Sequence, residues 1–233
     1  SLDKLGLDTS TFQQVKAAVD APHGLILVTG PTGSGKTTTL YSALNELNDP
    51  VYNIVTVEDP VEFQIPGINQ VPVKKEIGFT FANALRSILR QDPDIVMIGE
   101  IRDKETAEIA VEAALTGHQV LSTMHCNDAP GAVARLDDMG IAPFLISSSV
   151  ILACAQRLMR RICSHCKEPV TYPAKMFADL NFDPAEFKDV TLYRGRGCDR
   201  CKNSGYAGRL AIIEAMTVTD EIRKLIIVRA NAQ

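Results

Sequence analysis

Residues 30–37 have the composition and spacing of a phosphate-binding loop. In the pattern Gly-x-x-x-x-Gly-Lys-Thr, glycines allow backbone N–H groups to converge on phosphate oxygens, and the helix that follows adds its positive N-terminal end. Lys36 is expected to bridge the β- and γ-phosphates of ATP, and the Thr37 hydroxyl to bind the accompanying Mg²⁺. A glycine-rich turn that binds nothing is the alternative, which the apolar run before the loop disfavours. The expected nucleotide-binding residues are Gly30, Pro31, Thr32, Gly33, Ser34, Gly35, Lys36, Thr37 and Thr38.

Acidic residues follow two apolar runs that are expected to be strands. The run 95–98 leads through Gly99 to Glu100, from which a carboxylate could polarise a water that attacks the γ-phosphate. Gly99 stands where many P-loop enzymes have an Mg²⁺-binding Asp, so a further metal contact must come from elsewhere. Glu58 closes the run 53–57 and is the candidate for a second carboxylate near the water or Mg²⁺. For both acids, a solvated residue at a strand end is the alternative.

Two histidines flank the apolar run 119–124. If that run is a strand, His118 lies at its beginning and His125 at its end, so only His125 reaches the edge that carries the nucleotide. An imidazole there could sense the γ-phosphate, because its charge changes near neutral pH. A structural role is expected for His118 and is the alternative for His125.

Four of the six cysteines form two Cys-x-x-Cys pairs, which 31 residues separate. Such pairs supply four thiolates to a tetrahedral structural Zn²⁺, and the metal stabilises a segment that lacks a large core of its own. Unligated thiols and a redox dithiol are the alternatives, and the presence of two pairs disfavours the dithiol. The expected zinc ligands are Cys163, Cys166, Cys198 and Cys201, whereas Cys126 and Cys154 stand alone.

Apolar runs and helical patterns alternate along the chain, which predicts an α/β fold with a mainly parallel sheet, a RecA-like P-loop core. The expected strands are 25–29, 53–57, 95–98, 119–124 and 210–213, with an edge hairpin within 60–78. The expected helices are 9–20, 36–48, 80–90, 103–116, 128–138, 143–162 and 219–229. Thr9 or Ser10 is expected to cap the first helix, and helix 143–162 to end in the cations Arg157, Arg160 and Arg161.

Residues 163–208 are rich in Cys, Gly, Pro and charge and differ from the sequence around them. We therefore expect a nucleotide-binding core over residues 1–162, a zinc-binding insert over 163–208 and a return to the core over 209–233. Arg209 opens the strand after the insert and is a candidate nucleotide contact. A contact between subunits or domains is the alternative for Arg209.

The composition is that of a globular protein, with 45% apolar residues among 233, a net charge of −4 and a pI near 5.6. This net negative charge argues against a main role in binding a nucleic acid backbone, so no stable nucleic acid binding is expected. Neither a run of about 18 apolar residues nor a leader is evident, which predicts a soluble, unexported protein. The two ends of the sequence look like cuts in a longer protein.

Four stretches resemble, in order, the Walker A, Asp box, Walker B and His box of the ATPases of type II secretion and type IV pilus systems. They are residues 30–39, Val57–Glu62, Leu89–Asp103 and Thr116–His125. The tetracysteine segment resembles the pilus-assembly (PilB) and type II secretion (GspE) branches and is unlike the retraction motors. The sequences of residues 63–71 and 127–130 resemble the pilus-assembly branch more. Cys126 departs from the Thr that is common at its position.

The resemblance implies a hexameric ring on the cytoplasmic side of the inner membrane, where ATP hydrolysis drives a polytopic platform protein that adds pilin subunits. It also implies an N-terminal domain, outside this sequence, whose arginines complete the site. The chain alone should therefore bind ATP better than it hydrolyses it. Type II secretion is the nearest alternative function. A DNA-uptake or conjugation ATPase, which the acidic charge disfavours, and a nucleotide-responsive binding module without hydrolysis are further alternatives.

Overall fold

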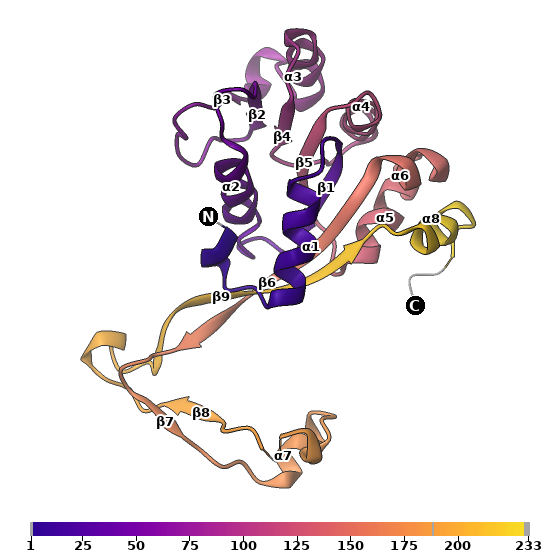
Figure 1. Ribbon diagram of the computed structural model, residues 1–233. Coiled ribbons are helices and arrows are strands. Elements are labelled where there is room, and N and C mark those ends of the chain that lie inside the picture. Colours follow the sequence, from indigo (N-terminus) through magenta and orange to yellow (C-terminus); the bar gives the residue numbers. More distant parts are fainter. Residues whose placement is uncertain (1, 188, 231–233) are drawn as a thin grey trace. The chain divides into compact units, whose positions relative to one another are not determined.

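A computed structural model describes residues 2–187 and 189–230 (Figure 1). The chain divides into two compact units, one made of Ser1–Arg157 with Ala211–Gln233 and the other of Leu158–Leu210. The first unit carries the sheet and the phosphate loop, and the second carries the paired cysteines. In this described part of the chain, none of the helices has the length and apolar character that a membrane span requires.

The sheet has seven strands in the order β3-β2-β4-β5-β1-β6-β9. Its strands pair in parallel from β3 through to β6, as the alternation of apolar runs and helices predicts. Every residue of β1, β2, β4 and β5 is buried, because helices cover both faces of the sheet. The strand bounds are β1 Gly24–Thr29, β2 Ile54–Glu58, β3 Asn69–Pro72, β4 Ile95–Ile98, β5 Gln119–Met124, β6 Val150–Ile162 and β9 Tyr206–Thr217.

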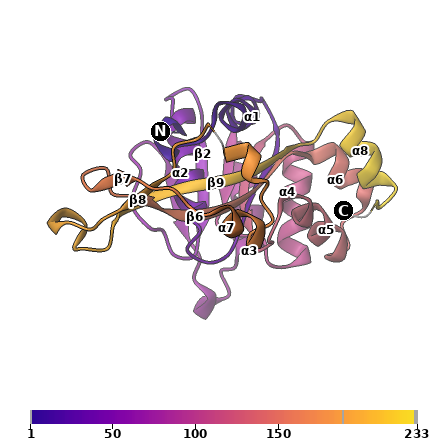
Figure 2. The same cartoon turned by 90° about the horizontal axis from the view of Figure 1, so that it is seen from below.

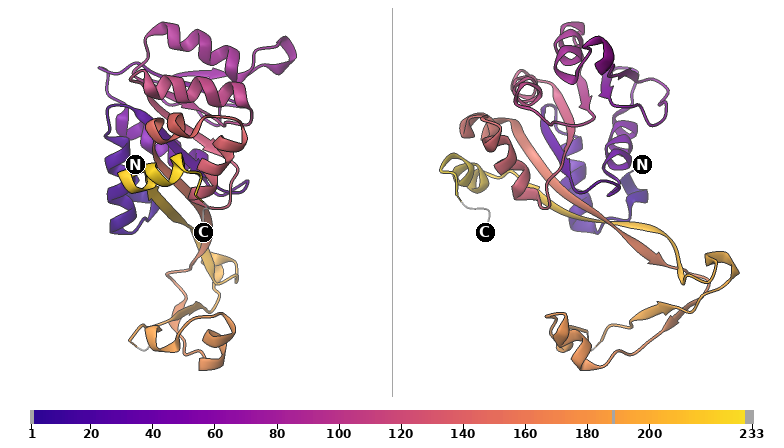
Figure 3. Two further views of the ribbon diagram at one scale, coloured as in Figure 1. Left: turned by 90° about the vertical axis from the view of Figure 1, so that its right-hand side faces the viewer. Right: turned by 180° about the vertical axis from the view of Figure 1, so that it is seen from behind.

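Two hydrophobic cores lie on opposite faces of the sheet. Figures 2 and 3 show the helices that lie on the two sides of the sheet. Successive side chains of β1 alternate between the two cores, so that Leu25 and Leu27 belong to one core and Ile26 and Val28 to the other. The second of these cores is covered by the short 3-10 helix η1 (Leu2–Leu5), by α1 (Thr9–Val19) and by α2 (Lys36–Leu47). The first is covered by α3 (Phe81–Ile88), α4 (Lys104–Leu115), α5 (Ala129–Asp138), α6 (Pro143–Ser149) and α8 (Asp220–Ile227).

Side-chain caps fix where most of these helices begin. Asp103 and Asp128 each accept a hydrogen bond from the backbone N–H three residues later, at the start of α4 and α5. The expectation of a Thr9 or Ser10 cap for α1 is wrong by one or two residues, because Asp8 caps it through the N–H of Thr11. In contrast, α2 begins after Gly35, which offers no side chain to its first N–H groups.

The expected helix 143–162 is wrong beyond its first two turns. Helix α6 ends at Ser149, and the chain continues as β6, which pairs with β1 from Val150 to Ala155. An apolar run of this length fits a buried strand as well as a helix, and only the neighbouring β1 decides between them. Arg157, Arg160 and Arg161 therefore lie on a strand, and no helix dipole acts on them.

The expected edge hairpin within residues 60–78 is also wrong. The edge strand β3 runs parallel to β2, with Val55 opposite Asn69 and Val57 opposite Val71. Parallel neighbours need a crossover and cannot be joined by a tight turn. Residues 59–68 form this connection.

The second unit is built from short elements. Its strands β7 (Lys167–Pro169) and β8 (Tyr193–Gly195) pair in antiparallel fashion, and η5 (Asp199–Cys201) contributes a single turn. Beyond this ribbon, α7 (Ala174–Asp179) and η4 (Pro184–Phe187) bring together the rings of Phe177, Phe182 and Phe187. The apolar contacts among the described residues of this unit are thus few and local.

Candidate functional site

The phosphate loop leaves the end of β1 and leads directly into α2. Gly30, Gly33 and Gly35 have φ values of +138°, +77° and +87°, a region that residues with side chains rarely adopt. At Gly30, a Cβ atom would lie 2.3 Å from the main-chain oxygen of Gln156 and 2.7 Å from Ser34 Oγ. Position 30 therefore admits only glycine, because the loop is pressed against β6.

Lys36 is folded back onto its own loop. Its Nζ donates hydrogen bonds to the carbonyl oxygens of Gly30 at 2.8 Å and Pro31 at 3.1 Å. Burial lowers the pKa of Lys36, and the negative charge of Glu100 opposes this effect. The ammonium group and the Glu100 carboxylate are thus close enough to interact, although they belong to the loop of β1 and the loop of β4.

Some buried side-chain oxygens near the loop have no hydrogen-bond partner within the described part of the protein, and a ligand could supply one. Of the described residues, three have a buried side-chain oxygen without a hydrogen bond: Ser34, Glu100 and Thr106. Leaving such an atom unpaired costs about 1–3 kcal/mol, so two of them beside one loop indicate a site for ligand groups. The uncapped N-terminus of α2 presents its first N–H groups at the same place. Thr37 is half-buried here, and Thr32, Gly33 and Thr38 are exposed. These residues fit a phosphate chain with Mg²⁺.

Glu100 lies beside two cations and an imidazole. It forms an ion pair with Arg102, its Oε2 lies 3.5 Å from Nε2 of His125, and Lys36 interacts with its charge. Hydrogen bonds fix the backbone here, since Gly99 N–H donates to the Val57 carbonyl and Thr123 Oγ1 donates to the Gly99 carbonyl. The structure therefore brings together three residues that the sequence proposed separately. Arg102 was missed, although its place two residues after Glu100 was a usable signal.

Glu58 faces the protein interior. Its carboxylate is 2% exposed and accepts hydrogen bonds from the hydroxyls of Tyr41 and Thr56 and from the side-chain amide of Gln70. Within the described residues, its partners thus come from α2, β2 and β3 rather than from Glu100 or Lys36. Gln70 also accepts a hydrogen bond from Ile65 N–H and donates to the Phe63 carbonyl, so the cluster ties down the connection after β2.

Gln156 is a residue of the site that the sequence did not single out. It is 1% exposed on β6, and its side-chain amide joins Ser34 of the loop to Thr39 of α2. The expected helix over 143–162 concealed it, because a helix would not have placed residue 156 beside residue 30. A polar residue at the end of an apolar run was the available signal.

The remaining predicted residues lie elsewhere. His118 begins β5, at the opposite end from His125, and its Nδ1 lies 3.0 Å from the Ala113 carbonyl oxygen. Arg209 is exposed in β9, in the second unit, and its contact with a nucleotide stays a prediction.

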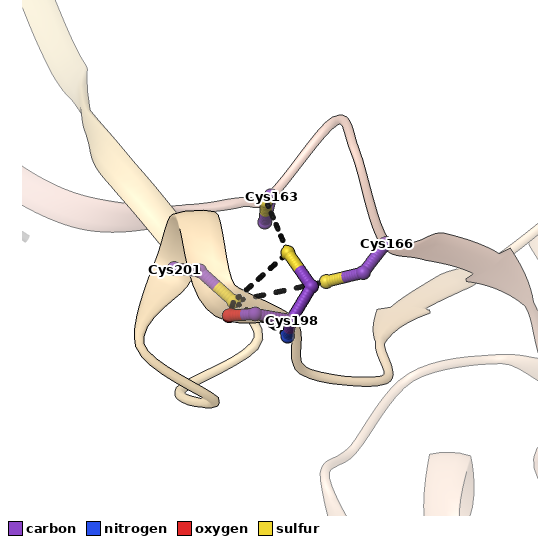
Figure 4. A group of neighbouring side chains, drawn as sticks. All are labelled: Cys163, Cys166, Cys198 and Cys201. Atoms are coloured by element: carbon purple, nitrogen blue, oxygen red, sulfur yellow. Dashed lines mark hydrogen bonds between the residues drawn. The ribbon is translucent and has the colours of Figure 1, made fainter.

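The four paired cysteines converge within the second unit. Their sulfur atoms all lie within 4.8 Å of one another and point toward a common centre (Figure 4). Three of the S···S distances are 4.0, 3.8 and 3.7 Å. Tetrahedral zinc with bonds of about 2.3 Å requires edges of about 3.8 Å, so the donor set fits this ion and not a disulfide. The four residues of this donor set are Cys163, Cys166, Cys198 and Cys201.

Backbone N–H groups donate to two of these sulfur atoms. Gly197 donates to Cys166, and Cys198 and Gly205 donate to Cys201. Burial raises the pKa of the Cys166 thiol to about 11. Burial also acts to raise the pKa of Cys201, but its two N–H donors, together with the thiols of Cys198 and Cys166, outweigh this and lower the value to about 6. A thiolate is the form that binds metal, and such donors stabilise it.

A family model described as "Type II/IV secretion system protein" matches residues 1–233. The chain belongs to this family. It is 55% identical to the type IV pilus assembly ATPase PilB of Myxococcus xanthus, over 99% of the chain and 41% of that protein. It is 53% identical to the type II secretion system ATPase E of Vibrio cholerae, over 100% of the chain and 46% of that protein. The chain therefore spans less than half the length of these two relatives.

Solved structures of the secretion family share the fold. The pilus retraction motor PilT with bound ADP superimposes with a TM-score of 0.72 at 30% identity, covering 98% of the chain and 56% of that protein. The ATPase DotB of Legionella pneumophila superimposes with a TM-score of 0.67 at 24% identity, which shows the fold alone. The α/β fold with a mainly parallel sheet, and the family resemblance stated from the motifs, are both confirmed.

The buried Tyr41–Glu58 pair predicts a pH dependence of stability. Burial, together with the Glu58 carboxylate, raises the pKa of Tyr41 to about 12 from a usual value of 10.0. The folded chain therefore favours the protonated phenol, and this contribution is complete below about pH 10 and lost as the pH rises toward about 12. Urea unfolding should show a loss of about 2–3 kcal/mol over this range in the wild type that is absent from Tyr41→Phe.

Tyr52→Phe is the matched control, because Tyr52 is 48% exposed. Its alkaline loss of stability should equal that of the wild type. An equal loss in Tyr41→Phe as well would show that the phenol does not carry the effect.

Proposed function

We propose that the chain binds and hydrolyses ATP as the motor part of a type IV pilus or type II secretion ATPase. The observation that carries the proposal is the pair of unsatisfied buried oxygens, Ser34 Oγ and Glu100 Oε2, beside Lys36 and the uncapped start of α2. Relatives at 55% and 53% identity that are named ATPases support it.

The residues divide the work of hydrolysis between phosphate binding and water activation. Lys36 exchanges the loop carbonyls for the β- and γ-phosphates, and the N–H groups at the start of α2 neutralise further phosphate charge. The Thr37 hydroxyl would hold Mg²⁺, which supplies positive charge to the phosphates. The free Oε2 of Glu100 orients a water and accepts its proton as the water oxygen bonds to the γ-phosphorus and the bond to ADP breaks, giving ADP and phosphate.

Arg102 and His125 assist by holding the Glu100 carboxylate. Arg102 pairs with one carboxylate oxygen, and His125 Nε2 lies 3.5 Å from the other, Oε2, which forms no hydrogen bond within the described chain and can accept one from a water. Glu58 takes a different part from the one that its strand-end position first indicated. We assign it to supporting the connection after β2 through Tyr41 and Gln70, and not to direct contact with the water or Mg²⁺.

Between the two branches we propose pilus assembly. The sequences of residues 63–71 and 127–130 support this choice. Two of the relatives, at 55% and 50% identity, are pilus assembly ATPases. Type II secretion is the second candidate, because the relatives of that system reach 54%. In either case we propose a homohexamer at the cytoplasmic face of the inner membrane. It would act on a polytopic platform protein, with arginines from an N-terminal domain completing the site.

We also propose that the second unit binds one structural Zn²⁺ through its four cysteines. The S···S distances near 3.8 Å and the N–H donors to sulfur support this assignment. The ion would take no part in hydrolysis and would stabilise a unit that has few apolar residues in its interior.

The role of Glu100 predicts a separation of binding from turnover. Glu100→Gln keeps the shape and removes the proton acceptor, so single-turnover hydrolysis should fall by about 100-fold or more. Binding of ATP, measured by calorimetry, should change by less than about threefold. Glu108→Gln, which alters an exposed acid on α4, is the control and should hydrolyse ATP like the wild type. Unchanged hydrolysis in Glu100→Gln would contradict the assignment.

Metal analysis tests the zinc proposal. The purified chain should contain about one zinc per chain, and Cys198→Ser should lose most of it and melt at a lower temperature. Cys126→Ser should retain the metal, because Cys126 lies in the first unit, outside the cluster. A wild-type chain that holds no metal and is unaffected by a chelator would refute the site.

Deletion of the gene distinguishes the two branches. If the protein assembles pili, the deletion should abolish surface pili, leave secretion of exoproteins intact, and be complemented by the wild-type gene but not by Lys36→Ala. Loss of exoprotein secretion with normal pili would instead support the type II secretion candidate.

A further inference from the structure

Gln156 contacts both the phosphate loop and α2, although it lies 122 positions after Ser34 in the chain. Its main-chain oxygen occupies the space that a side chain on Gly30 would need. Its side-chain Nε2 donates to the Ser34 carbonyl at 2.8 Å, and its Oε1 accepts from Thr39 Oγ1 at 2.7 Å. One residue of β6 thus lies against the beginning of the loop and forms hydrogen bonds to Ser34 near its end and to Thr39 of α2.

The hydrogen bond to the Ser34 carbonyl has a consequence for the next N–H group. In a planar trans peptide, the carbonyl of one residue and the N–H of the following residue point in opposite directions. Gln156 draws the Ser34 carbonyl toward β6, so the N–H of Gly35 is turned away from β6. Gly35 lies at the start of α2, where N–H groups gather to receive phosphate oxygens.

The side-chain amide suits this task because it has a donor end, the NH₂ group, and an acceptor end, the oxygen. Thr39 Oγ1 donates to the oxygen, and this fixes which end of the amide meets the Ser34 carbonyl. A glutamate would present a second acceptor to that carbonyl, and a leucine would leave both partners unsatisfied. Gln156 is 1% exposed, so water cannot readily take its place.

We infer that Gln156 is a positioning residue for nucleotide binding, which orients the Ser34–Gly35 peptide toward the phosphates. The inference rests on the proposed binding of ATP and adds a residue on a strand that the motif does not include. Gln156 itself does not touch the nucleotide. It acts through Ser34 and Thr39, and its loss weakens phosphate binding by allowing the peptide to rotate.

The chain offers a matched control in a second buried glutamine. Gln119, 3% exposed at the start of β5, donates through Nε2 to the carbonyls of Ala18 and Val19. It is the same residue type with the same kind of partners, and it joins β5 to the end of α1, away from the loop. A purely structural role for Gln156 predicts that the two glutamines behave alike.

The experiment compares Gln156→Leu with Gln119→Leu. Urea unfolding without nucleotide measures stability, and calorimetry with ADP and Mg²⁺ measures affinity. Both variants should lose stability, because each leaves buried carbonyls unpaired. Only Gln156→Leu should weaken ADP binding, by about tenfold or more, whereas Gln119→Leu should change it by less than about twofold.

If Gln156→Leu does not fold, a second pair of variants tests the same inference. Thr39→Val removes the donor that orients the amide, and Thr39→Ser restores it. Thr39→Val should weaken ADP binding by about threefold or more, and Thr39→Ser should recover the wild-type affinity.

Three results would overturn the inference: wild-type affinity in folded Gln156→Leu, wild-type affinity in Thr39→Val, or an equal loss of affinity in Gln119→Leu. A wild-type chain that does not bind ADP would be a different failure, since it contradicts the proposed function and removes this inference with it.

Discussion

The burial of β1 between β5 and β6 is the constraint that fixes the position of the phosphate loop at the edge of the sheet. All six residues of β1 are buried, and their side chains alternate between the two cores. This strand cannot slide along its neighbours without moving a whole set of side chains to the wrong core. Packing along the strands therefore fixes the position of Gly30 relative to Gln156. The register between β1 and β6 in turn constrains the conformation of the loop.

The two strand-end acids show how much their surroundings determine what a carboxylate can do. Glu58 and Glu100 end neighbouring parallel strands, β2 and β4, so their backbones lie at the same edge of the sheet. Glu58 turns inward, where hydroxyl and amide donors occupy both of its oxygens. Glu100 pairs with Arg102 and lies beside His125, and its Oε2 has no hydrogen-bond partner among the described residues. The first arrangement stabilises the fold, and the second leaves an acceptor atom available to a ligand or a water.

The sequence predicted what depends on local pattern. The phosphate loop is continuous, the cysteine spacing is short-range, and the carboxyl ends of parallel strands meet by the geometry of the fold, which brought Glu100 and His125 together. The inward turn of Glu58 could not be predicted, because it depends on Tyr41 and Gln70 from other elements. Gln156 was hidden for a related reason. The run before it is apolar throughout, and only contact with β1 makes it a strand.

Another consequence concerns how such a protein can vary during evolution. The chain leaves the sheet on β6 and returns on β9, and these strands are neighbours in the sheet. A segment whose two ends are already side by side can be lengthened, shortened or exchanged at a small cost in loop entropy. The residues between them can therefore diverge, with or without a metal, while the seven strands and the nucleotide edge stay the same. In this sense the cysteine unit can be exchanged without any change to the sheet that carries the phosphate loop.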